Sequence, residues 1–306
     1  MNVLLLGTSG FIGRHVAAAL AAAGHTVRAA SRRSQPPIDF ARMVQPDDWL
    51  PHLQDVDAVV NTVGVLRGSR RQPMHALHTA APRALFDACA QAGVRRVLHV
   101  SALGIDGNPT LYARSKQAAD AHLLALTSSG ALDGLVLRPS VVFGAEGASS
   151  RLFLALARLP LLLLPRPVQR ARVQPLAVGE LAEVAARLLP DARRTGLTEL
   201  GGPESLTLAA FIASLRQQMG HGAARVLTLP DGLTRLSARL GDAVPVAPWC
   251  SETLALLAQD NVTAAGTLRD LLGREPTPPE CLLRGWRCSS AVVDVGSSTH
   301  PATRNP

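Results

Sequence analysis

The residues best suited to proton transfer in this chain are its single tyrosine and its single lysine, Tyr112 and Lys116. A spacing of four places both side chains on one face of a helix, which we expect over residues 111–127. A lysine ammonium can lower the pKa of a nearby phenol and anchor a ribose, while the phenol donates or accepts a substrate proton. The pair therefore predicts acid/base chemistry, and the alternative is a buried structural tyrosine with an unrelated lysine neighbour.

A glycine-rich turn lies near the N-terminus, between an apolar run at residues 2–6 and a helix expected over residues 11–23. Gly7, Gly10 and Gly13 have the spacing that allows a sharp turn, a close approach to a pyrophosphate and tight helix–strand packing. The N-terminus of the following helix would present free N–H groups and a partial positive charge to the anion. Because the turn connects a strand to a helix, it predicts dinucleotide binding.

The cofactor prediction depends on the residues directly after the second expected strand, 26–30. A carboxylate there would bind the ribose 2′-hydroxyl of NAD, but the chain has Ser31, Arg32 and Arg33 at this point. Two guanidinium groups suit a 2′-phosphate. The sequence therefore favours NADP, with NAD as the alternative and two solvated loop arginines as the structural explanation.

The first two-thirds of the chain alternates short apolar β-rich runs with alanine-rich helical stretches, which is typical of a parallel sheet with helices on both faces. This pattern predicts an α/β fold with a Rossmann-type doubly wound sheet. The strands are expected at 2–6, 26–30, 58–61, 96–100, 134–137, 173–178 and 198–200. The helices are expected at 11–23, 74–92, 111–127, 150–158, 179–189 and 208–219, with Pro82 starting or kinking the second and Thr207 capping the last.

The chain divides into three predicted parts. Residues 1–222 form the dinucleotide-binding domain, with 144–175 contributing to a substrate pocket. Residues 223–284 form a small helical subdomain, with helices at 233–240, 251–258 and 264–272. Residues 285–306, rich in Ser, Thr, Gly and Pro, are predicted to form a loose tail.

The composition limits the classes of partner that the protein is expected to bind. The net charge is +8, but all of the 31 basic residues except Lys116 are arginines, and they are dispersed without interleaved aromatics, so we predict no nucleic-acid binding. No apolar run is long enough to span a membrane, and a weak attraction to anionic membrane surfaces is left open. The four cysteines have no metal-site spacing, and His75 and His78 are expected to be a solvated pair, so no metal is predicted. A cytoplasmic location is the default expectation.

Four segments together resemble the short-chain dehydrogenase/reductase superfamily, in its extended or atypical branch of epimerase- and dehydratase-like proteins. They are the glycine turn, residues 57–64 (DAVVNTVG), the Tyr112–Lys116 pair and residues 138–144 (RPSVVFG). The resemblance covers about residues 1–280. Within that branch, residues 59–64, 101–104 (SALG) and 200–207 (LGGPESLT) are most similar to the NAD(P)H-binding accessory subunit of respiratory complex I and its bacterial relatives.

The resemblance implies a role for each matching residue. The pyrophosphate would be held by the three glycines together with the backbone of Ser9, Phe11 and Ile12, with Arg32 and Arg33 at the adenosine end. Val63 and Gly64 would line the cofactor, and Pro139 and Val142 would lie near the nicotinamide. Tyr112 would be the acid/base, and Lys116 its partner and a ribose ligand. Extended members place a catalytic Ser or Thr where this chain has Ala102, so Ser101 is the candidate substitute.

Two functions are consistent with these residues. The first is an NADP(H)-dependent oxidoreductase or epimerase that uses Tyr112 and Lys116. The second is a non-catalytic dinucleotide-binding accessory, assembly or redox-sensing protein, which Ala102 and the short 101–112 loop favour. The small-molecule substrate is not specified; an apolar ligand such as a quinone is suggested by residues 152–164 and by the family analogy. The sequence gives no indication of oligomeric state.

Overall fold

The computed structural model describes residues 1–284 except 33, 35–36, 70–72 and 244–248, so Arg33 and the predicted tail lie outside the described residues. The strands are β1 (Asn2–Leu6), β2 (Thr26–Ala30), β3 (Ala58–Asn61), β4 (Arg96–Val100), β5 (Asp133–Pro139), β6 (Val142–Phe143), β7 (Leu161–Pro165), β8 (Arg172–Val173), β9 (Leu176–Ala177), β10 (Gly196–Leu200), β11 (Leu206–Thr207) and β12 (Arg225–Leu229). The helices are α1 (Phe11–Ala22), α2 (Ala81–Ala92), α3 (Leu111–Ser128), α4 (Ala148–Arg158), α5 (Arg166–Arg170), α6 (Val178–Leu188), α7 (Leu208–Gln218), α8 (Asp231–Asp242), α9 (Ser251–Leu256) and α10 (Thr267–Leu272), with 3-10 turns η1 (Pro46–Asp48), η2 (Leu50–His52) and η4 (Pro279–Cys281) and a π-helical turn η3 (Ala76–Ala80).

A six-stranded parallel sheet forms the centre of the molecule, in the order β10-β5-β4-β3-β1-β2. Its inner strands are apolar runs because both of their faces are covered: Val3, Leu4, Leu5 and Leu6 of β1 are all buried. The predicted α/β doubly wound fold is confirmed.

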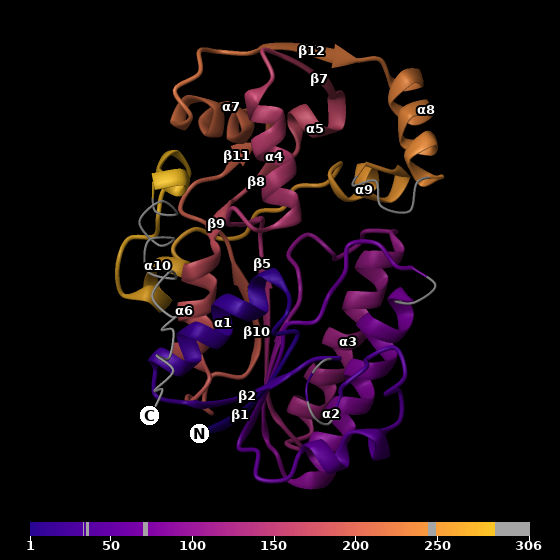
Figure 1. The fold of residues 1–306 in the computed structure, drawn as a ribbon, viewed down its shortest axis with the longest axis vertical. Helices are drawn as coiled ribbons and strands as arrows, with labels where there is room; N and C mark the ends of the chain where they lie inside the picture. The colour runs from indigo at the N-terminus through magenta and orange to yellow at the C-terminus, as the bar shows by residue number, and fades with distance from the viewer. Residues whose placement is uncertain (33, 35–36, 70–72, 244–248, 285–306) are drawn as a thin grey trace, which may run out of the picture.

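Helices cover the sheet on both faces, α2 and α3 on one side and α1 and α6 on the other (Figure 1). The core on the α2/α3 side includes Leu4, Leu85 and Leu123, and the core on the α1/α6 side includes Leu5, Leu20 and Leu181. Alternate residues of one strand thus enter opposite cores, as the two-residue period of a strand requires.

The chain reverses its direction of travel across the sheet at β1. Strand β2 pairs with one edge of β1 and strand β3 with the other, and Leu6 aligns with both Ala30 and Asn61. The carboxyl ends of the three strands therefore meet at a topological switch point, where open α/β sheets bind their ligands.

A smaller subdomain lies beyond the carboxyl ends of the strands, at the upper end of Figure 1, and contains α4, α5, α7, α8, β7 and β12. Its core includes Phe153, Leu162 and Phe211. Strand β12 pairs in parallel with β7 and was not predicted, but the region after residue 223 is otherwise helical, with α8, α9 and α10, so the predicted mostly helical C-terminal region is confirmed. The predicted division at residue 222 stays a prediction. Across the described ranges, no helix combines the length and apolarity needed to cross a bilayer.

Two local predictions about helix boundaries are confirmed. Pro82 is the second residue of α2, and the π-helical turn η3 comes directly before it, so regular α-helical geometry starts at the proline as predicted. The side chain of Thr207 caps α7 by accepting the N–H of Ala210 at 3.1 Å.

Candidate functional site

The glycine turn after β1 is built by backbone contacts that leave no room for side chains. Gly7 has a φ of +85°, and a Cβ atom there would lie 2.7 Å from Oγ1 of Thr62. A Cβ atom on Gly13 would overlap the carbonyl oxygen of Gly7. Thr62 Oγ1 donates to the carbonyl of Leu6 at 2.7 Å, which fixes the end of β3 against the end of β1.

Helix α1 begins at the edge of an open pocket, which Ser9 and Gly10 line. Gly10 is the N-cap and no side chain caps the helix. The pocket lies along the carboxyl ends of β1, β2 and β3 and is lined by Gly7, Ser9, Gly10, Ala30, Ser31, Arg32, Ile38, Asp39, Phe40, Thr62, Val63, Gly64, Val65 and Leu77. Uncapped N–H groups over such a pocket suit an anion such as a pyrophosphate.

The far end of this pocket holds charges of both signs. Arg32 lines it, as predicted, and Arg33 lies outside the described residues. Asp39 lines it as well, with Oδ1 accepting the N–H of Ala41 at 3.1 Å. Asp39 was not predicted from the sequence, because it lies in an irregular segment some residues after β2 and not at the strand end.

Lys116 lies against the opposite end of the pocket. Its Nζ donates to the carbonyl of Val100 at 3.0 Å, and a Cβ atom added to Gly64 would lie 3.4 Å from that Nζ. The side chain of Tyr112 comes from the same face of α3 and is half-buried. The structure thus places Lys116 behind the Gly64 wall of the predicted dinucleotide pocket, with Tyr112 one turn earlier on the same face of α3.

His78 connects the pocket loop to the tyrosine. Its Nε2 accepts the N–H of Val65 at 3.0 Å, so Nδ1 carries the hydrogen and lies 3.1 Å from Ser115 Oγ, which in turn donates to the carbonyl of Tyr112. The imidazole also meets the Tyr112 ring edge-on at 5.5 Å. His78 is buried, so the expectation of a solvated pair with His75 was wrong. Burial lowers the pKa of His78 to about 3, and the charge of Lys116 adds to this effect.

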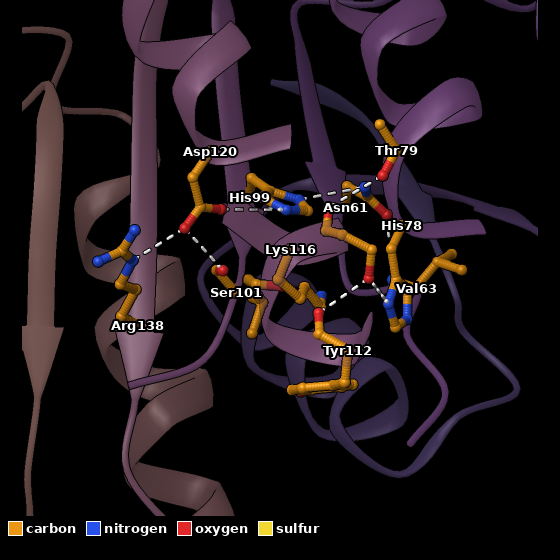
Figure 2. A network of polar contacts seen from close by, with 12 residues as sticks. Asn61, Val63, His78, Thr79, His99, Ser101, Tyr112, Lys116, Asp120 and Arg138 are labelled. Carbon is orange, nitrogen blue, oxygen red and sulfur yellow. Dashed lines mark hydrogen bonds and ion pairs between the residues drawn. The ribbon is translucent and has the colours of Figure 1, made fainter. Parts of the chain in front are cut away.

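A line of buried polar groups runs behind the pair, across the ends of β3, β4 and β5 (Figure 2). Asn61 Oδ1 accepts the N–H of Val63 at 3.0 Å, while its Nδ2 lies 3.2 Å from His99 Nδ1. His99 Nε2 lies 3.7 Å from Oδ1 of Asp120, and Oδ2 of Asp120 accepts from Arg138 Nε at 2.8 Å. The line therefore ties the Val63–Gly64 wall of the pocket to α3.

Ser101 belongs to this line. Its Oγ donates to Oδ2 of Asp120 at 2.9 Å, so the hydroxyl is directed to a buried carboxylate. Its role as a substitute for the missing Ser or Thr at Ala102 stays a prediction.

Burial sets the protonation of the acid/base pair. It raises the pKa of Tyr112 to about 12, and the negative charge of Asp120 adds to the rise. It lowers the pKa of Lys116 to about 8, against the opposing effect of Asp120. Near neutral pH the phenol therefore keeps its proton and the ammonium its charge, which is the state of a proton donor.

Pro139 ends β5 and Val142 begins β6, two strands that lead toward the phosphate turn. A Cβ atom on Gly144 would lie 2.8 Å from the ring of Phe11, the first residue of α1. Val142 and Ile12 of α1 pack against the same core cluster, so the segment predicted to lie near the nicotinamide and the start of α1 share one core.

The N-terminus of α3 is held from two sides. Thr110 Oγ1 accepts the N–H of Ala113 at 3.2 Å, and Oε1 of Glu252, from α9, accepts the N–H of Tyr112 at 2.8 Å. A carboxylate there is favoured by the helix dipole. The helix that carries the acid/base pair is therefore held in part by the C-terminal region.

These features fit a dinucleotide: a turn that excludes side chains, uncapped N–H groups, and a lysine beside a glycine at the far wall. No group of three or more His, Cys, Asp or Glu side chains in the described ranges could hold a metal ion. The fold and site define a Rossmann-type dinucleotide-binding protein.

Comparison with known proteins assigns the chain to a family within this class of dinucleotide-binding proteins. The model of the NAD dependent epimerase/dehydratase family matches residues 3–162. The chain belongs to this family of dinucleotide-binding oxidoreductases and epimerases, and its predicted place in the extended short-chain dehydrogenase/reductases is confirmed. The narrower resemblance to the complex I accessory subunit stays a prediction.

Two curated relatives differ in how much of the chain they match. A ceramide reductase of Caulobacter vibrioides is 28% identical over 291 residues, which span 90% of this chain and 86% of the relative. An epimerase family protein of Mycobacterium bovis is 37% identical over 116 residues, which span 35% of this chain and 38% of the relative. The first match thus spans most of the chain, and the second about a third of it.

Solved structures share the whole fold. The NADPH-dependent quinone oxidoreductase of Escherichia coli, complexed with NADPH, superposes with a TM-score of 0.71 at 17% identity, covering 93% of this chain and 99% of that one. The UDP-glucose 4-epimerase of Thermus thermophilus, in complex with NAD, gives a TM-score of 0.66 at 18% identity, covering 94% and 99%. At such identities the likeness establishes the fold alone.

Proposed function

We propose that this protein is an NADP(H)-dependent reductase whose proton donor is Tyr112. The observation that carries the proposal is the position of Lys116, whose Nζ lies beside Gly64 in the wall of the dinucleotide pocket while Tyr112 shares its helix face. No other tyrosine or lysine exists in the chain to supply this chemistry.

The bound cofactor would supply hydride transfer to or from its nicotinamide ring. The protein residues would supply the proton and the positioning. Tyr112, with a pKa raised to about 12, would donate its proton to the substrate oxygen in the reductive direction. Lys116 would hydrogen-bond the ribose and offset the charge that forms on the phenolate, since its ammonium is buried on the same face.

The preference for NADP rests on Arg32, which lines the adenosine end of the pocket where a 2′-phosphate would lie. Asp39 on the same pocket could instead accept hydrogen bonds from adenine or ribose groups, and its charge would oppose a phosphate placed against it. NAD is therefore the alternative that a direct comparison of the two cofactors has to exclude.

The substrate we propose is a carbonyl group on an apolar, ceramide-like lipid. The relative that matches 90% of this chain is named a ceramide reductase. In the segment whose sequence suggested an apolar ligand, Leu162 and Leu164 are buried in the core of the subdomain, so the support for a lipid substrate is the name of this relative.

A second candidate function is a non-catalytic dinucleotide-binding accessory or redox-sensing protein. Ala102 in place of the usual Ser or Thr favours it, and so does the bond that directs Ser101 to Asp120. This candidate needs the same pocket but no proton transfer by Tyr112.

The test is NADPH oxidation by the purified protein with a ceramide whose hydroxyl is replaced by a ketone, in detergent micelles. Tyr112→Phe removes one hydroxyl and should lower turnover about a thousandfold while leaving NADPH binding unchanged. Turnover that is unaffected by Tyr112→Phe would exclude the mechanism. Tight NADPH binding without turnover of any carbonyl lipid would favour the second candidate.

A further inference from the structure

Helix α8 presents its apolar side to solvent and not to the protein. Leu233, Leu236 and Leu240 are 54%, 54% and 65% exposed and lie along one face of the helix. The buried positions of the same helix are Thr234 and Ala238, which are small. The leucines of a surface helix ordinarily pack against the protein core, so this exposed row of leucines indicates a site of interaction with a partner.

A second set of exposed leucines lies on the two-stranded sheet whose strand β12 leads into α8. In β7, Leu162 and Leu164 are buried, while Leu161 and Leu163 point outward and are 46% and 57% exposed. Leu163 aligns with Leu227 of β12, so the two side chains share the outward face. We call the exposed leucines of β7, β12 and α8 the distal apolar surface, because these elements lie at the end of the molecule farthest from the six-stranded sheet (Figure 1).

The charges around this surface are predominantly positive. The segments that carry it, residues 156–170 and 221–243, contain Arg158, Arg166, Arg170, Arg225, Arg235 and Arg239, all exposed, against Asp231 and Asp242. The chain has no acidic residue at all between Glu146 and Glu180. On α8 itself, Arg235 and Arg239 lie along one border of the leucine stripe.

Apolar side chains bordered by arginines match the surface of an anionic bilayer. Leucines can enter the boundary between headgroups and acyl chains, while arginine stems extend to place their guanidinium groups among the phosphates. A second copy of the chain fits less well, because a two-fold contact would bring the same arginines face to face. We propose that the distal apolar surface docks this protein on anionic lipid membranes.

The proposal is independent of the proposed reaction, because no residue of the distal apolar surface lines the dinucleotide pocket. It has a clear consequence for topology. A docked molecule would hold its smaller subdomain against the lipid and its six-stranded sheet away from it.

The experiment is flotation of the full chain with vesicles of phosphatidylcholine alone or mixed with an equal amount of phosphatidylglycerol. We expect binding about tenfold tighter to the anionic vesicles, weakening as salt is added. The triple variant Leu233→Ser/Leu236→Ser/Leu240→Ser should reduce binding by about tenfold or more. Leu66→Ser/Leu197→Ser, which changes two exposed leucines elsewhere, is the control and should bind as the parent does.

Folding of each variant is checked by its circular dichroism and NADPH binding. If the triple variant does not fold, Arg235→Glu/Arg239→Glu replaces it and should abolish the preference for anionic vesicles. Equal binding to both vesicle types, or parent-like binding by the variants, would overturn the proposal. A dimer in solution that the triple variant dissociates would do the same in favour of a second copy. None of these outcomes depends on whether Tyr112→Phe lowers turnover.

Discussion

The dinucleotide pocket and the distal apolar surface are built from opposite kinds of residue. In the pocket, glycines are required because a single added carbon at Gly7 or Gly13 would meet backbone or Thr62. On the distal surface, large apolar side chains such as Leu240 are exposed to solvent over most of their area. The pocket thus depends on positions where no side chain fits, whereas the distal surface consists of side chains that do not contribute to the folded core.

The two regions should therefore tolerate different changes. A substitution in the pocket should act through the folded structure and the bound dinucleotide together, whereas one on the distal surface should leave folding intact. Variants in each region test whether the two regions differ in this way.

The largest effect is expected for Gly13→Ala. The new methyl group would overlap the carbonyl of Gly7, so we expect a loss of about 3 kcal/mol in the free energy of unfolding and no measurable NADPH binding. Gly179→Ala in α6 is the matched control, because its Cβ would meet nothing within 4 Å, and it should raise stability by up to about 1 kcal/mol. Urea denaturation of both variants decides the point; equal losses would contradict the close packing described for the turn.

Lys116→Met should lower turnover about a hundredfold without unfolding the protein. Because burial lowers the pKa of Lys116 to about 8, its ammonium is present below that pH and is lost as the pH rises through it. If the protein is the proposed reductase, the parent protein should therefore lose activity above about pH 8, while the variant should be slow and insensitive to pH in this range. A pH–rate profile of both proteins is the measurement. The same falling limb in the variant would assign it to another group.

Arg32→Ala should weaken NADPH binding about tenfold and leave NADH binding almost unchanged if Arg32 binds the 2′-phosphate as proposed, because one guanidinium–phosphate contact would be lost. Asp39→Asn should have the opposite sign and favour NADPH, since it removes a negative charge from the same end of the pocket. Fluorescence titrations with both cofactors test the two variants. An unchanged ratio in Arg32→Ala would remove the basis for NADP.

The smallest effect is expected on the distal surface. Leu236→Ala should change the free energy of unfolding by no more than about 0.5 kcal/mol, since the side chain is 54% exposed. Leu162→Ala, in the same subdomain but buried, should cost about 2–5 kcal/mol. Thermal or urea denaturation compares the pair. A large loss in Leu236→Ala would mean that the leucine is part of the core.

Much of the fold could be predicted from the sequence because the sheet is buried on both faces. Strands β1, β3 and β4 are short apolar runs bounded by turns, and they were placed within a residue of their observed ends. Strand β12 was missed, because its residues are mostly exposed and it pairs with β7, about sixty residues earlier, which no local pattern reveals.

The residues of the candidate site also fall into those that the sequence could predict and those that it could not. The glycines have a fixed spacing within one turn, and Tyr112 and Lys116 within one helix, so the sequence could predict their positions relative to one another, while their roles stay predictions. His78 and Asp120 act through partners on other elements, and their burial cannot be inferred from a single helix. Asp39 was missed because an irregular segment returns it to the pocket.

The bond from Tyr112 N–H to Glu252 has a consequence for protein engineering. The carboxylate that completes the first turn of α3 belongs to α9, more than a hundred residues later in the chain. A chimera that exchanged the C-terminal region for that of a relative would also exchange this partner. If the donor sequence has no acceptor at the same place, the N–H of Tyr112 would lose its partner and the first turn of α3 would be less firmly held. Restoring a carboxylate at position 252 would then be the first change to make in the chimera.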